Sequence, residues 1–81
     1  MKQLLEFILQ NILGKDSKFD VNEVDDGSVV TLTVKTSDSE GGLVIGKGGK
    51  VIKAIRNILR IKATLEKKKI ILLVNPTEIA S

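Results

Sequence analysis

Residues 44 to 52 read Val44-Ile45-Gly46-Lys47-Gly48-Gly49-Lys50-Val51-Ile52, so three glycines stand between two aliphatic pairs. Glycine has no Cβ atom, so the backbone can turn sharply there and a sugar-phosphate chain can lie against it. Lys47 and Lys50 add positive charge at the same place. The stretch therefore predicts a tight turn suited to phosphate.

A helix is predicted directly after the glycines, from residue 50 to about residue 64. Its apolar side chains return at helical spacing: Val51, Ile52, Ile55, Ile58 and Leu59. The N-terminus of a helix presents free N–H donors and the positive end of the helix dipole, and both attract phosphate. Lys53 and Arg56 continue the basic surface one and two turns later.

A short helix over residues 40 to 45 is predicted before the glycines. Ser37 and Glu40 stand three apart and form a capping box that satisfies the first backbone donors of a helix. Gly41 and Gly42, followed by β-branched residues, are poor helix formers, so packing must hold this helix. A conflict of this kind between propensity and structure is typical of a functional site.

The rest of the chain supplies one more helix and three strands. Apolar residues at helical spacing predict a helix over 2–13, ended by Gly14. Residues 19–22 alternate as a half-buried strand, and the turn residues 25–27 join it in a hairpin to a strand over 28–35. A buried strand is expected over 69–74, stopped at Asn75 and Pro76. The predicted order is α-β-β-α-α-β in one α+β domain, residues 1–81.

Composition removes most enzyme classes. The 81 residues contain no Cys and no His, so the usual zinc ligands, a thiol nucleophile, a catalytic triad and a haem ligand are missing. No cofactor or metal and no enzymatic activity are therefore expected, and the lack of Cys fits a reducing cytoplasm. Polar residues interrupt the apolar N-terminal stretch, which argues against a signal peptide, and no run is long enough for a membrane span.

Charge is divided unevenly along the chain. Residues 1–46 hold four basic and eight acidic side chains, a net of −4, whereas residues 47–81 hold nine basic and two acidic ones, a net of +7. A basic half centred on a glycine turn favours a polyanionic partner. Lysines that merely solubilise a helix surface remain the alternative.

Two nucleotide-binding motifs resemble the glycine stretch and fail in detail. A P-loop would need Ser or Thr after Lys47, where Gly48 stands, and its loop would contain an apolar run. The dinucleotide fingerprint would need a further glycine at Val51. A structural corner between helices, without any ligand, is the remaining alternative.

The aliphatic residues and glycines from Val44 to Ile52, together with the element order, resemble a KH domain of type II, the prokaryotic arrangement. Such a domain has a three-stranded sheet with helices packed on one face, and its GXXG loop binds the backbone of single-stranded RNA. The length of the chain and its N-terminal helix are similar to the bacterial KhpA (YlqC-like) family of small RNA-binding proteins.

The resemblance implies which residues contact RNA. The GXXG loop is Gly46, Lys47, Gly48 and Gly49, followed by Lys50 and Lys53 on phosphate. Three aliphatic residues are expected in the groove that receives bases: Val44, Ile45 and Ile52, the last of which is equally suited to the core. Arg56 contacts a base edge or phosphate, or is a solvated helix residue.

A non-catalytic role in binding about four nucleotides of single-stranded RNA is the function that the resemblance implies, as a small RNA chaperone or post-transcriptional regulator. The chain has only two aromatic residues, so stacking is weak and a single domain should bind loosely. The family also implies a homodimer, or a heterodimer with a larger KH protein of the KhpB (Jag/EloR) type. The alternative function is therefore a protein-interaction module that scaffolds such a partner.

Overall fold

Three helices and four strands make up the described part of the chain, which comprises residues 1–14, 16–75 and 77–78 of the computed structural model. In order they are α1 (Lys2–Leu13), β1 (Asp20–Asp25), β2 (Val29–Lys35), α2 (Asp38–Ile45), a 3-10 turn η1 (Lys47–Gly49), α3 (Lys50–Leu65), β3 (Lys69–Val74) and β4 (Thr77–Glu78). The predicted order α-β-β-α-α-β is confirmed, and β4 follows it.

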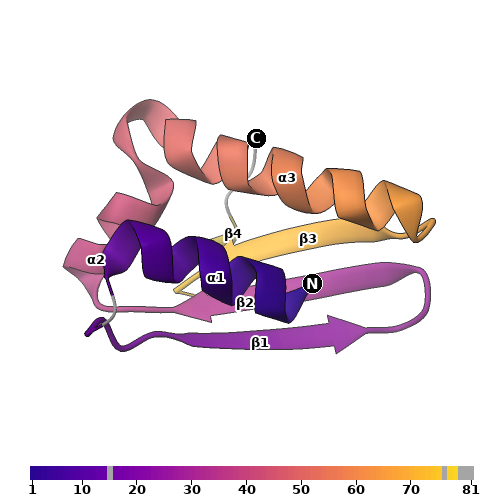
Figure 1. Cartoon of the computed structure of the whole chain (residues 1–81), viewed down its shortest axis with the longest axis horizontal. Helices are drawn as coiled ribbons and strands as arrows, with labels where there is room; N and C mark the ends of the chain where they lie inside the picture. The colour runs from indigo at the N-terminus through magenta and orange to yellow at the C-terminus, as the bar shows by residue number, and fades with distance from the viewer. Residues whose placement is uncertain (15, 76, 79–81) are drawn as a thin grey trace.

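The strands form one sheet in the order β1-β2-β3-β4, so the expected three-stranded sheet is extended by the two-residue strand β4. β1 and β2 are an antiparallel hairpin, β2 and β3 are parallel, and β4 pairs antiparallel with the end of β3. Parallel neighbours need a crossover connection, and α2, η1 and α3 supply it. Figure 1 shows the result: the turn between α2 and α3 lies at one end of α3, and the turn into β3 lies at the other.

All three helices pack on one face of the sheet, as expected (Figure 1). α1 contributes Leu5 and Leu9 to the core, α2 contributes Val44, and α3 contributes four residues. The inward side of the sheet is aliphatic and is formed by Val21, Val30, Leu32, Val34, Leu72 and Val74. The helical and strand periodicities in the sequence therefore converge on a single aliphatic core.

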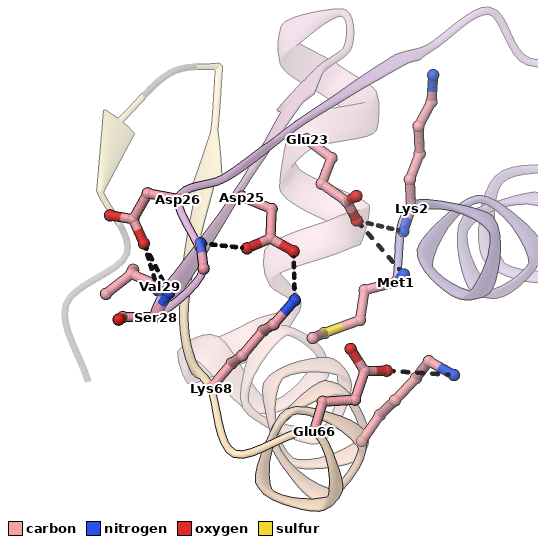
Figure 2. Close-up of polar contacts among 11 residues, drawn as sticks. Met1, Lys2, Glu23, Asp25, Asp26, Ser28, Val29, Glu66 and Lys68 are labelled. Atoms are coloured by element: carbon pink, nitrogen blue, oxygen red, sulfur yellow. Dashed lines mark hydrogen bonds and ion pairs between the residues drawn. The ribbon is translucent and has the colours of Figure 1, made fainter.

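The first strand differs from its prediction. β1 begins at Asp20, leaves out Phe19 and continues to Asp25, and Val21 is its one buried residue. The alternation fails because two inward positions carry carboxylates that bind neighbouring elements. Glu23 Oε1 accepts the Lys2 N–H at 3.0 Å, which gives α1 an acceptor at its N-terminus, and Asp25 Oδ2 lies 2.5 Å from Lys68 Nζ (Figure 2).

The hairpin turn contains the expected residues. Asp25 Oδ1 accepts the Gly27 N–H at 2.8 Å, and Asp26 Oδ1 accepts the N–H groups of Ser28 and Val29 at 2.8 and 2.7 Å (Figure 2). Gly27 has a φ of 96°, a conformation that suits glycine. These bonds fix where β2 starts and therefore its register with β1.

The predicted cap of α2 is also present. Ser37 Oγ accepts the Glu40 N–H at 3.3 Å and donates to Glu40 Oε1 at 3.1 Å. The other Glu40 oxygen accepts the Ser17 hydroxyl. Glu40 thus holds the segment between α1 and β1 against the start of α2, which fixes the direction in which α2 approaches the glycine turn.

Asn75 joins the end of β3 to the start of α2. Its Oδ1 accepts the Thr36 N–H at 2.6 Å, its Nδ2 donates to Thr36 Oγ1 at 3.2 Å, and its own N–H donates to the Val34 carbonyl at 2.7 Å. A Cβ atom at Gly41 would lie 2.6 Å from Asn75 Nδ2. A side chain at position 41 would therefore clash with Asn75, so glycine is needed where α2 packs against the end of β3. Pro76, expected to stop this strand, lies outside the described residues.

Candidate nucleic-acid interface

The turn between α2 and α3 is built from glycines in conformations that other residues adopt at a cost. The φ angles of Gly46, Gly48 and Gly49 are 77°, 67° and 77°. A Cβ atom at Gly46 would lie 2.4 Å from Val51 Cγ2 and 2.9 Å from the Val51 nitrogen, whereas one at Gly48 would have no neighbour within 4 Å. Gly46 is thus required by close packing, and Gly48 leaves an open backbone surface.

Hydrogen bonds inside the turn keep it compact. The Gly46 N–H donates to the Gly42 carbonyl at 2.8 Å, and the Gly49 N–H donates to the Gly46 carbonyl at 3.0 Å. The Lys50 N–H bonds to the Lys47 carbonyl. Two donors next to the start of α3 are therefore used internally, so the expected supply of free N–H groups is smaller than for a simple helix start.

Positive side chains surround this turn. Lys47, Lys50 and Lys53 are exposed, and the first turn of α3 contains no acidic residue. Cations at a helix N-terminus oppose the helix dipole, whereas an anion there is stabilised by it. The lysines and the dipole therefore both favour an anionic ligand at this end of α3.

The aliphatic residues expected in a base-binding groove lie elsewhere. The side chains of Val44 and Ile52 are 0% and 1% exposed and belong to the core, and Ile45 is half-buried against it. The 3.6-residue period of each helix turns these positions inward. Val44 and Ile52 anchor the two ends of the turn in the core, and Ile45 alone of the three lies partly at the surface.

Arg56 lies in a basic hollow beside the turn. A hollow of about 310 Å³ is lined by Lys53, Arg56, Asn57 and Arg60. Asn57 Oδ1 accepts from the Arg60 guanidinium at 2.8 Å, which orients that side chain. Asn57 and Arg60 line this hollow but were not among the residues that the sequence predicted for the site; their helical spacing from Lys53 and Arg56 was the available signal.

A second hollow continues the first between α3 and β3. It measures about 340 Å³ and shares Arg56 and Arg60 with the first one. Its other lining residues are Thr64, Lys68, Lys69 and Ile70. The basic residues of α3 therefore form one side of a shallow furrow, whose first lining residue, Lys53, lies one helical turn after Lys50 at the start of α3.

Neither a metal-binding cluster nor a membrane-spanning helix is found among the described residues. Within residues 1–14, 16–75 and 77–78, no group of three or more His, Cys, Asp or Glu side chains is placed to hold a metal ion. Among the helices in that part of the chain, none has the length and apolar character needed to cross a membrane.

The parallel strands β2 and β3 are connected by a helix, a GXXG turn and a second helix. Together with the preceding helix and hairpin, this arrangement defines a KH domain of type II. The sequence profile described as "KhpA/KhpB, KH domain" matches residues 2–74. The chain therefore belongs to the KhpA/KhpB family of KH domains.

Curated relatives agree with this assignment. The chain is 38% identical over 71 residues to the RNA-binding protein KhpA of Clostridium perfringens, which covers 88% of this chain and 95% of the relative. The identity to KhpA of Clostridium acetobutylicum is 35% with the same coverage, and to KhpA of Chlamydia trachomatis it is 31% over 86% and 90% of the two chains. No significant match is found among solved structures.

Proposed function

We propose that this chain, residues 1–81 as a single KH domain, binds single-stranded RNA without catalysing a reaction. One observation carries the proposal: three glycines with positive φ form a turn whose backbone is exposed at Gly48, beside Lys47, Lys50 and Lys53, and the first helical turn lacks acids. In this arrangement the GXXG turn binds the phosphates of about four nucleotides. The relatives named as RNA-binding proteins support the same ligand.

The chemistry of the furrow indicates weak binding with little sequence preference. Ile45 and Ile70 offer limited apolar surface, and the other residues that line the two hollows of the furrow are polar or basic, with no aromatic ring among them. Phosphate contacts then dominate the free energy of binding. A cytoplasmic RNA chaperone or a post-transcriptional regulator would use such binding.

The double substitution Lys47→Asp with Gly48→Asp tests the proposal. It changes the net charge of the turn by −3, and Asp tolerates the left-handed φ of Gly48 better than most residues. We expect RNA affinity to fall at least about tenfold, because repulsion replaces attraction at the phosphates. Fluorescence anisotropy with a labelled short single-stranded RNA measures the change. The native chain should show a log-log salt slope near −2, for about three neutralised phosphates.

A matched control separates the turn from overall charge. Lys18→Asp with Asn22→Asp makes the same charge change of −3 at two exposed positions that line none of the hollows beside α3. Circular dichroism establishes that both variants fold. If both variants lose RNA equally, or if the native chain shows no salt-dependent binding, the GXXG turn is not a phosphate clamp.

A second candidate function is pairing with another KH domain, and a specific surface favours it. Three aliphatic side chains of α3 are exposed: Ile58 at 46%, Ile61 at 66% and Leu65 at 79%. Their spacing puts them along one side of the helix, away from the core residues Ile55 and Leu59. We propose that this stripe pairs with a second copy of the chain or with a KhpB-type partner. Pairing would raise RNA avidity without new contacts.

Replacing Ile61 by Lys is expected to shift the chain from dimer to monomer, since a charge in the centre of an apolar interface is left without a partner. Sedimentation velocity across a concentration series measures the change. Val24→Lys, at another exposed aliphatic position, is the control and should leave the assembly unchanged. A native chain that sediments as a monomer at all concentrations would contradict self-pairing.

A further inference from the structure

A third hollow lies at the opposite end of α3 from the GXXG turn. It measures about 480 Å³ and is lined by Ser28, Val29, Thr64, Lys67, Lys68 and Lys69. It shares Thr64, Lys68 and Lys69 with the hollow between α3 and β3. The furrow therefore continues past the end of α3 onto the hairpin turn, and it ends among three lysines.

The backbone fixes these lysines in one tight turn. The Lys67 N–H donates to the Thr64 carbonyl at 3.0 Å, and the Lys68 N–H donates to the Ala63 carbonyl at 2.8 Å. Lys67 has a φ of 59°, at a position after a helix where glycine is the usual residue. A lysine there costs about 1 kcal/mol relative to glycine, so the turn holds a cation where conformation alone favours glycine.

We propose that the turn Lys67–Lys69 is a second phosphate-contact site, so that RNA bound at the GXXG turn continues along α3 and onto this end of the domain. This inference rests on the RNA binding proposed above and specifies its extent. α3 has 16 residues and is about 24 Å long. Stacked nucleotides advance about 3.4 Å each. Four of them span about 14 Å, which is shorter than α3, whereas ten span about 34 Å, which is long enough to reach from the GXXG turn to the far end of the helix.

Asp25 competes with RNA at this site. Its Oδ2 lies 2.5 Å from Lys68 Nζ, as Figure 2 shows, whereas Lys67 and Lys69 have no ion pair among those found in the described residues. The hydrogen bond from Lys68 holds the pKa of Asp25 below its ordinary value, and the same contact raises the pKa of Lys68. Both groups therefore stay charged near neutral pH, and in the absence of RNA the Lys68 ammonium is held in an ion pair with Asp25.

The length of the RNA tests the inference. Labelled U4 and U10 are titrated by anisotropy at several salt concentrations with the native chain and with Lys67→Ala, Lys69→Ala. With the native chain, the U10 salt slope should be steeper than the U4 slope by about 1.4, for two added phosphates. The double variant should bind U4 as the native chain does, lose the extra slope and bind U10 about tenfold more weakly.

Asp25→Asn gives an independent readout with the opposite sign. Asparagine keeps an Oδ1 acceptor for the Gly27 N–H and removes the charge that pairs with Lys68. U10 should bind about threefold more tightly, as release from a surface ion pair allows, with U4 unchanged. Two controls repeat these charge changes at exposed positions away from the hollow. Lys18→Ala with Lys35→Ala matches the double lysine variant, and Asp16→Asn matches Asp25→Asn.

The outcomes separate this inference from the proposed function. If U4 binds and the U10 slope equals the U4 slope, or if Lys67→Ala, Lys69→Ala leaves U10 binding unchanged, the second site is wrong and RNA binding stands. If neither RNA binds the native chain, the proposed function fails and the inference fails with it. Equal losses in the Lys18, Lys35 control would assign the effect to net charge and would likewise overturn the second site.

Discussion

Gly46→Ala should lower the free energy of unfolding by about 3 kcal/mol, the largest effect expected of any single methyl group added to the GXXG turn. The φ of 77° and ψ of 167° at Gly46 belong to a region that is essentially restricted to glycine. The new methyl carbon would also lie 2.4 Å from Val51 Cγ2 and 2.9 Å from the Val51 nitrogen. The backbone nitrogen cannot move without displacing the start of α3. Urea denaturation followed by circular dichroism measures the change.

Gly48→Ala is the matched comparison. Gly48 also has a positive φ, of 67°, but an added methyl would have no neighbour within 4 Å. The loss of stability should therefore be limited to the left-handed conformation, about 1 kcal/mol. Equal losses for the two variants would show that contact with Val51 contributes nothing at Gly46 and would contradict the steric explanation.

Asn75→Ala is expected to cost about 2 to 3 kcal/mol of stability, the second largest effect. The Thr36 N–H is partly buried and would lose its 2.6 Å bond to Asn75 Oδ1. Alanine would also hold the φ of 56° less readily than asparagine. Because Asn75 contacts the start of α2 beside Gly41, we also expect the GXXG turn to become less ordered. Hydrogen exchange of the Thr36 and Gly49 amides measures these local effects alongside denaturation.

Asn75→Gly separates the two causes. Glycine adopts the positive φ without strain but removes the same hydrogen bonds, so this variant should be less destabilised than Asn75→Ala by about 1 kcal/mol. The expected order of stability is native, then glycine, then alanine. If the two variants match the native chain, the bonds between Asn75 and Thr36 do not hold β3 to α2.

Much of the fold could be predicted because local signals agree with tertiary packing. The apolar periods of α1 and α3, the Ser37 cap of α2 and the aliphatic run of β3 each predict the element that the structure contains. β1 was harder because its inward carboxylates, Glu23 and Asp25, are stabilised by distant partners that no local pattern shows. β4 has two residues, too few for a periodic signal, and its pairing depends on the position of β3.

The candidate site could be predicted only in part, for the same physical reason. The glycines and lysines are adjacent in sequence, and their chemistry is local. Whether an aliphatic residue faces a groove or the core depends on where the neighbouring elements lie, and Val44 and Ile52 face the core. The third hollow joins the end of α3 to Ser28 and Val29, which lie far earlier in the sequence. Only the folded arrangement brings them to one surface.

The parallel pairing of β2 with β3 also determines when during folding the GXXG turn acquires its shape. Val29 pairs with Lys69, forty positions further along the chain, and the whole segment from α2 to α3 lies inside that closed loop. Closing such a loop costs conformational entropy before the strand contacts compensate it. The turn should therefore become ordered late, together with β3. A ligand that binds only the completed turn stabilises the entire domain by mass action, so the free energy of unfolding should rise with the concentration of that ligand.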